Sequence, residues 1–224
     1  VLKFYYDANQ NSLKVIARKP LIIQNNALGY KITYWLESFE HNFSTRILSY
    51  SGLTYYEDLI RPNKRKAQAA RWILNRESAY EGSVMHFIRS VHAGTLASSG
   101  FILRRLDKVE GNRKGRYSNV VDPKILVEAD FSDTIENQKI IQFSKYLYVL
   151  YDKELEELPY LIKLQPFKKP IPAPQTSIVQ LVGTNAVEIF ANGHLEPAIS
   201  FFLEGYWSYE KLDKLLPLDY NDKN

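Results

Sequence analysis

The first 55 residues show hydrophobic patterns that predict β-strands. Between Tyr30 and Phe39, polar residues alternate with apolar ones, as expected for a strand with one buried face. Short apolar runs of the same kind occupy residues 2–6, 13–17, 21–23 and 46–50. We therefore expect four or five antiparallel strands before residue 55.

A helical pattern follows Pro62. Asn63 can cap a helix, and Lys64 to Ala79 contains strong helix formers with no glycine or proline. Gly82 and the good N-cap Ser83 favour a break, so one long helix or two shorter ones both fit. One helical face is expected to carry Ala69, Trp72, Ile73, Arg76 and Tyr80, and its apolar stripe continues with Val84, Phe87, Ile88 and Val91.

Strand-like runs return after Gly100. They occupy residues 101–106, 124–128, 139–151, 177–182, 187–190 and 199–203. Because strands follow helices instead of alternating with them, the order favours an α+β fold with mostly antiparallel sheets packed on one or two central helices. We predict a single domain over 1–224, with β-rich segments 1–60 and 100–205, a helical segment 63–99 and a short C-terminal helix 208–216.

Composition is that of a folded globular chain. Hydrophobic residues make up 45% and charged residues 24% of the 224 positions. With no cysteine, disulfides, thiolate zinc sites and cysteine nucleophiles are excluded. No apolar run approaches the roughly 20 residues of a membrane-spanning helix, so we expect no transmembrane segment in this chain.

Charge is uneven along the chain, although the net charge is only +4. A local basic field attracts nucleic acid or other polyanions. We favour a solvated helix face and a charged loop over a nucleic-acid partner. The two basic blocks comprise Arg61, Lys64, Arg65, Lys66, Arg71 and Arg76, and then Arg104, Arg105, Lys108, Arg113, Lys114 and Arg116.

Neither metal nor catalytic signatures are complete. His86 and His92 are six residues apart and would point to nearly opposite sides of a helix, unlike zinc ligands spaced by one turn. Ser83 near His86 lacks the Gly-x-Ser-x-Gly elbow. Adjacent carboxylates such as Glu156 and Glu157 are best interpreted as surface charges. The sequence predicts no catalytic residue, no metal ligand and no cofactor.

One constellation suggests binding. Arg76 and Tyr80 lie one helical turn apart and, with His86 and Arg89, could hold a carboxylate or phosphate through charge-assisted hydrogen bonds. The alternative is structural: Arg76 pairs with a neighbouring glutamate or caps a strand carbonyl, and Tyr80 belongs to the core.

Tryptophans provide the other candidate surface. Trp207, beside Tyr206 and Tyr209, is the best candidate for an exposed aromatic platform. Trp35 lies inside a strand pattern and Trp72 on the helical stripe, so both are predicted to be packing residues.

Three segments resemble the conserved region of bacterial carboxypeptidase-like regulatory domain-containing proteins: residues 27–39, 76–91 and 204–220. In that family a transthyretin-like β-sandwich usually comes first, so the resemblance implies such a sandwich N-terminal to this region in the full-length chain. It also implies a location in the periplasm or cell envelope. It carries over no catalytic residue.

Together these observations predict a non-catalytic binding or structural module of a bacterial cell-envelope protein, with a glycan, a peptide or a protein as partner. A hydrolase acting on envelope glycan or peptide, with an acidic pair assembled from distant segments, is the alternative. Nucleic-acid binding through the basic blocks is a third hypothesis.

Overall fold

The computed structural model describes residues 2–61, 66–106, 130–133, 139–184 and 186–221. Two compact units comprise residues 1–77 and 78–224, and the boundary lies inside helix α1 (Lys66–Tyr80). The single domain expected over 1–224 stays a prediction. The α+β class is confirmed, and every strand pairing among the described residues is antiparallel.

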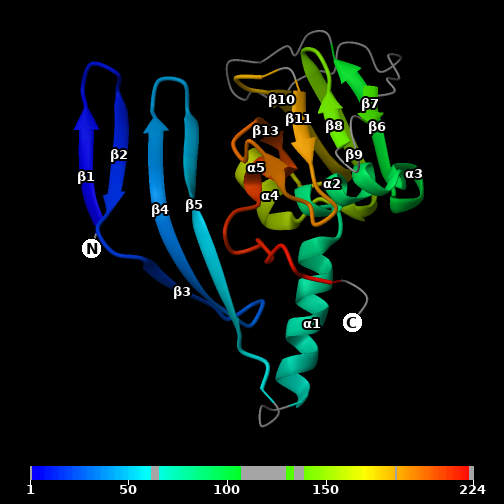
Figure 1. Ribbon diagram of the computed structural model, residues 1–224, viewed down its shortest axis with the longest axis horizontal. Helices are drawn as coiled ribbons and strands as arrows, with labels where there is room; N and C mark the ends of the chain where they lie inside the picture. The colour runs from blue at the N-terminus through cyan, green and yellow to red at the C-terminus, as the bar shows by residue number, and fades with distance from the viewer. Residues whose placement is uncertain (1, 62–65, 107–129, 134–138, 185, 222–224) are drawn as a thin grey trace. The chain divides into compact units, whose positions relative to one another are not determined.

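Unit 1 contains the first sheet, whose two long hairpins are visible in Figure 1. Strand β4 is its centre: it pairs along its length with β5 on one side, and with β3 and β2 at its two ends on the other. Strand β1 pairs with β2 at the edge. The prediction of four or five strands is confirmed. Their bounds are β1 Leu2–Asp7, β2 Ser12–Ala17, β3 Leu21–Asn25, β4 Tyr30–Asn42 and β5 Ile47–Asp58.

The first part of α1 is attached to the turn between β3 and β4. Trp72 is buried, and its indole N–H donates to the Asn26 carbonyl at 2.8 Å. Gly29 lies against the same ring with a φ of +71°, and a Cβ there would be 2.3 Å from Trp72 Cδ2. Only glycine fits both the backbone conformation and the space. The expected cap Asn63 lies outside the described residues.

The predicted break at Gly82 is confirmed. Ser83 caps helix α2 (Val84–Ala93), since its hydroxyl accepts a hydrogen bond from the His86 N–H at 3.1 Å. Gly94, with a φ of +69°, ends α2, and the short helix α3 (Leu96–Ser99) follows. The helical segment is therefore three helices with glycine at the break and at both later ends.

The described residues of unit 2 form two four-stranded sheets, in the orders β13-β10-β9-β6 and β12-β11-β8-β7. The run predicted over 139–151 is split into β8 and β9 by a turn at Lys145, where φ is +63°. The predicted run 124–128 lies outside the described residues. The bounds are β6 Phe101–Leu106, β7 Asp130–Asp133, β8 Lys139–Gln142, β9 Tyr146–Leu155, β10 Pro174–Leu181, β11 Ala186–Ile189, β12 Leu195–Glu196 and β13 Phe201–Gly205.

One hydrophobic cluster joins α2 to both sheets of unit 2. Phe87, Ile88 and Val91 form the buried stripe of α2, as the sequence predicted. Their partners include Val149 and Val179 from one sheet, and Ile141, Val187 and Ile189 from the other. Burial of this stripe is what makes α2 the central helix of unit 2.

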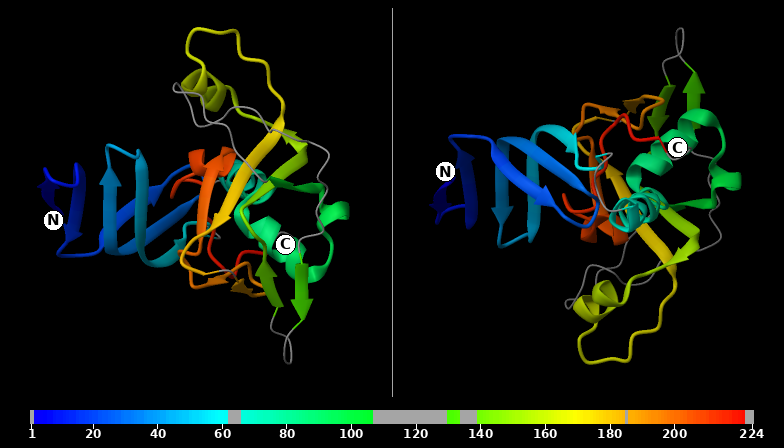
Figure 2. Two further views of the ribbon diagram at one scale, coloured as in Figure 1. Left: turned by 90° about the horizontal axis from the view of Figure 1, so that it is seen from above. Right: turned by 90° about the horizontal axis from the view of Figure 1, so that it is seen from below.

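Near the C-terminus, the helix expected over 208–216 is instead α5 (Tyr206–Tyr209). Ser208 does not cap it from outside, because its hydroxyl donates to the Gly205 carbonyl from within the helix. Helix α4 (Leu158–Leu164) and the proline-rich segment after it extend away from the sheets of unit 2 and are drawn yellow in Figure 2. That segment contains no strand before Pro174, and prolines, which cannot donate to a strand ladder, account for this.

Candidate functional site

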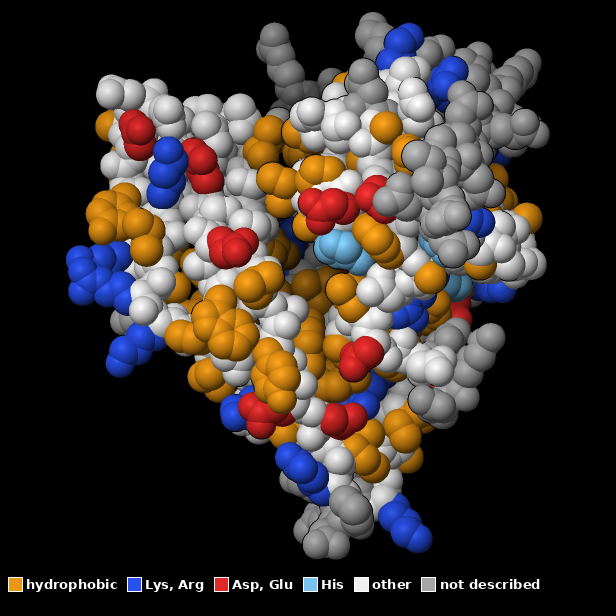
Figure 3. Space-filling view, in the orientation of Figure 1, with side chains coloured by type: hydrophobic (Ala, Val, Ile, Leu, Met, Phe, Trp, Pro, Cys, Tyr) orange, Lys and Arg blue, Asp and Glu red, His pale blue; other side chains and the backbone are white. Residues whose placement is uncertain are grey.

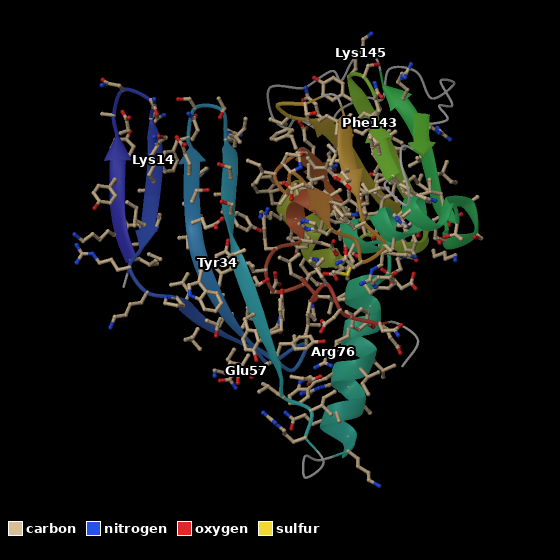
Figure 4. The ribbon with its side chains drawn as sticks, in the orientation of Figure 1. Lys14, Tyr34, Glu57, Arg76, Phe143 and Lys145 are labelled. Atoms are coloured by element: carbon tan, nitrogen blue, oxygen red, sulfur yellow. The ribbon has the colours of Figure 1, made fainter. Side chains whose placement is uncertain are left out.

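Arg76 is a structural link within unit 1 (Figure 4). Its guanidinium donates two hydrogen bonds to the Asp58 carboxylate, both at 2.9 Å, one to the Leu28 carbonyl at 2.7 Å and one to the Gly29 carbonyl at 3.1 Å. The group also lies 3.8 Å from the centroid of the Tyr30 ring. Arg76 therefore caps carbonyls of the β3–β4 turn, which is the structural alternative considered from the sequence.

The ion pair with Arg76 changes the pKa of Asp58, the last residue of β5. Partial burial acts to raise the pKa of its carboxyl group, but the hydrogen bonds from Arg76 and the Ile60 N–H, together with the charges of Arg76 and Arg61, outweigh burial. The pKa of Asp58 consequently lies below its ordinary value. The charged form is favoured, and the ion pair persists at neutral pH.

The other residues of the predicted constellation lie in unit 2 and have protein partners. Tyr80 stacks on the buried His86 ring at a centroid distance of 4.7 Å. His86 Nδ1 accepts a hydrogen bond from the Gly82 N–H at 3.2 Å and lies 3.5 Å from a Glu81 oxygen. Arg89 donates to the carbonyls of Tyr220 and Leu218, at 2.9 and 3.1 Å. Each side chain thus serves the folding of its own unit, while the binding hypothesis for the set stays a prediction.

The expectations for two tryptophans are reversed. Trp207 is only 5% exposed, and its indole N–H donates to the Gly82 carbonyl at 2.7 Å, so it is a core residue and offers no platform. Trp35 is 44% exposed on β4, where a packing residue was expected. The buried side of β4 is occupied by Tyr30, Ile32 and Tyr34, and alternation places Trp35 on the opposite side.

An exposed apolar face therefore exists on the sheet of unit 1, formed by Ile22, Trp35, Leu53 and Tyr55. All four are large and exposed. Strand register places them together: Trp35 is opposite Leu53, and Thr33 lies between Ile22 and Tyr55. In Figure 3 hydrophobic side chains gather over the part of this unit where β3, β4 and β5 run side by side.

Polar groups border the exposed apolar face at both ends. Lys31 and Glu57 form an ion pair of 2.7 Å at one end, and the Ser38 and Ser51 hydroxyl groups are hydrogen-bonded at 2.8 Å at the other. Register places both pairs on the same side of the sheet as Trp35. A ligand on this face would meet flat apolar rings flanked by hydrogen-bonding groups.

A second arrangement in unit 2 is the Glu210 cluster, formed by Glu154, Glu157, Glu210 and Lys214, whose charges influence one another. Glu154 is the penultimate residue of β9, Glu157 precedes α4 and Glu210 follows α5. Lys214 Nζ lies 2.6 Å from a Glu157 oxygen, and Gln175 donates to Glu154 at 3.1 Å.

Burial raises the pKa of Glu210 to about 7. Lys214 acts to lower the pKa, whereas Glu157 and Glu154 raise it further. Burial likewise raises the pKa of Glu154, partly offset by the hydrogen bond from Gln175. Local sequence patterns missed this cluster because Glu210 and Lys214 lie far along the chain from Glu154 and Glu157. Only Glu157 was considered, and then as a surface charge.

The substitution Glu210→Gln is expected to flatten the pH dependence of folding stability. The pKa of Glu210 is higher folded than unfolded, so wild-type stability is greatest below the unfolded value near 4.5 and falls as pH rises through about 7. Glutamine stays neutral, so the variant should gain about 1–3 kcal/mol relative to wild type at pH 8 and little at pH 4. Urea unfolding at several pH values measures the difference. Equal pH slopes for wild type and variant would contradict it, and Glu77→Gln at an exposed site provides the control.

Nucleic-acid binding through the two basic blocks stays a prediction. In the first block Arg76 is buried in its link with Asp58, and Lys64 and Arg65 lie outside the described residues. In the second block Arg104 and Arg105 belong to β6, while Lys108, Arg113, Lys114 and Arg116 lie outside the described residues.

Among the described residues, no group of three or more histidine, aspartate or glutamate side chains could hold a metal ion. None of the described helices has the length and apolar character to cross a lipid bilayer. No protein-family model, curated protein or solved structure matches the chain.

Proposed function

We propose that the chain is a non-catalytic binding module of a bacterial cell-envelope protein, and that it binds glycan through the exposed apolar face. The observation that carries the proposal is the placement of Trp35 and Tyr55, both exposed, on one face of a sheet. Large exposed apolar patches on soluble units are typical of binding sites. The envelope location is supported by the family resemblance of residues 27–39, 76–91 and 204–220.

Glycan fits this face better than a purely apolar ligand. A sugar ring has one CH-rich face, which packs on an aromatic ring, and a rim of hydroxyl groups, which need hydrogen-bond partners. Trp35 and Tyr55 are diagonal neighbours, about 7–8 Å apart in an antiparallel pair, so two rings of one chain could be contacted. Lys31, Glu57 and the Ser38–Ser51 pair provide polar groups around them.

Replacing Trp35 by alanine is expected to weaken glycan binding at least tenfold with little change in stability. The affinity should fall because the stacking surface is removed. Stability should change by less than about 1 kcal/mol, because a half-exposed side chain contributes little to the core. Calorimetric titration with soluble peptidoglycan and envelope polysaccharide fragments measures the affinity, and thermal unfolding measures the stability.

Two further variants sharpen this test. Trp35→Phe should retain most of the affinity, because it keeps an aromatic ring. Phe167→Ala removes an aromatic ring that is 99% exposed in unit 2 and should leave binding unchanged. Binding of glycan by Trp35→Ala at wild-type affinity, or absence of glycan binding by the wild type, would overturn the proposal.

The Glu210 cluster favours a second candidate, hydrolysis of glycan or peptide. A carboxyl group with a pKa of about 7 can donate a proton at neutral pH, as the general acid of a hydrolase must. Glu210 would be the general acid, with Glu154 or Glu157 as the second carboxylate. Release of reducing ends or new amino termini by the wild type, lost in Glu210→Gln but kept in Trp35→Phe, would support this candidate. A wild type without turnover leaves the binding module as the function.

A further inference from the structure

Strand β1 is an apolar edge. Among the described strands it pairs with β2 alone, and its outer edge carries no strand. Phe4, Tyr5 and Tyr6 are 64%, 49% and 61% exposed. The strand contains no proline, and its register with β2 has no bulge. Natural proteins usually protect such an edge, because its free backbone groups pair readily with another strand.

The sequence of β1 is self-complementary around Tyr5. In a strand, Lys3, Tyr5 and Asp7 lie on one face, and Phe4 and Tyr6 lie on the other. Two antiparallel copies aligned at Tyr5 would place Lys3 opposite Asp7 of the partner subunit, and Phe4 opposite Tyr6 of the partner subunit. Each pair would occur twice. Opposite-charge and aromatic cross-strand pairs both stabilise a sheet.

We propose that a second copy of this chain binds along β1, in an antiparallel pairing with Tyr5 on the two-fold axis. The unit 1 sheets of the two copies then become one continuous sheet. The hairpin that carries β1 is marked by Lys14 in Figure 4. Asp7 is held in place by the N–H groups of Asn9 and Gln10, which donate to Oδ1 at 2.9 and 3.1 Å. Its other oxygen would accept a hydrogen bond from the ammonium group of Lys3 of the partner subunit.

Register distinguishes this partner from an unrelated strand. A shift by one residue would place Phe4 opposite Tyr5 of the partner subunit and would turn one copy over, so the charged pairs would be lost. A strand from another protein would need its own charges at matching positions. In β1 the complementary charges are already present in one chain, four residues apart on one face.

A single cysteine tests the register, because the chain has none of its own. In Tyr5→Cys the two sulfur-bearing residues would face each other across the axis, within the Cα separation that a disulfide allows. We expect mild oxidation to convert most of this variant to a disulfide-linked dimer. Phe4→Cys is the matched control, because the two Phe4 positions are offset by two residues in this register. Its copies should cross-link poorly alone, but well when mixed with Tyr6→Cys, which lies opposite.

Sedimentation of the wild-type chain over about a hundredfold range of concentration should show a reversible dimer. Lys3→Glu places like charges opposite each other twice and should weaken association about tenfold, with an unchanged circular dichroism spectrum. Wild type that stays monomeric throughout, with Tyr5→Cys no more prone to cross-link than Phe4→Cys, would overturn the proposal. Monomers that instead capture an added extended peptide along β1 would assign the edge to a different partner and overturn it as well.

Discussion

Replacing Phe87 by alanine is expected to destabilise unit 2 by about 3–5 kcal/mol. The Phe87 ring is fully buried at the centre of the cluster that joins α2 to both sheets. Its centroid lies 5.5 Å from that of Phe101 and 5.2 Å from Trp207, in tilted or edge-on arrangements. Truncation leaves a cavity lined by side chains from α2 and both sheets, which cannot all move inward together.

Urea unfolding monitored by tryptophan fluorescence measures this loss, since Trp207 is a direct neighbour of the ring. Phe167→Ala is the matched control, because it makes the same substitution in the same unit at a fully exposed position. That variant should change the free energy of unfolding by less than about 0.5 kcal/mol. A comparable loss in both variants would show that Phe87 is not central to the core.

Replacing Arg76 by alanine is expected to destabilise unit 1 by about 2–4 kcal/mol. Four hydrogen bonds to Asp58, Leu28 and Gly29 are removed together. A loss near 4 kcal/mol would require that the groups left unpaired were fully buried. Because the Asp58 side chain is 48% exposed and can bind water again, the loss should lie in the lower part of this range. Urea unfolding measures the loss of stability, and faster hydrogen exchange of the β3–β4 turn amides would place that loss at the turn that Arg76 caps.

Two variants separate a structural from a ligand-binding role of Arg76. Arg71→Ala removes an exposed arginine from the same helix and should be nearly neutral. Arg76→Lys keeps the charge but cannot form the two parallel bonds to Asp58, so most of the destabilisation should remain. If Arg76→Ala folded with wild-type stability and lost affinity for an anionic ligand, the binding hypothesis would be supported and the structural role rejected.

Local patterns predicted much of the fold because the forces that shape single elements act over a few residues. The bounds of β6 match the predicted run 101–106, and the break between α1 and α2 lies at Gly82 and Ser83. Glycine in the left-handed region and a serine N-cap are local signals. The end of the last helix was missed, because Leu216 is buried in a non-helical tail that no local pattern describes.

Trp35 shows that part of the site was present in the sequence pattern. The alternation that buries Ile32 and Tyr34 puts every second residue outward, and Trp35 belongs to that outward set. Burial was predicted because Trp35 lies inside a strand pattern, but membership of a strand does not say which face of the sheet a residue occupies. The Glu210 cluster differs, because its carboxylates meet only through the packing of β9, α4 and α5. No spacing rule in one sequence links Glu154 to Glu210.

Tyr5 and Trp35 belong to the same side of one sheet. Strand register pairs Tyr5 with Lys14, Lys14 with Glu40 and Glu40 with Ser49, so all four side chains lie on one side of the sheet. Leu53, opposite Trp35, lies on that same side, because it is four residues after Ser49 in β5. Two copies joined through β1 would therefore present their exposed apolar faces in one direction. A polymer with repeated units could then engage both at once, and its apparent affinity would rise with polymer length through effective concentration, without any new contact.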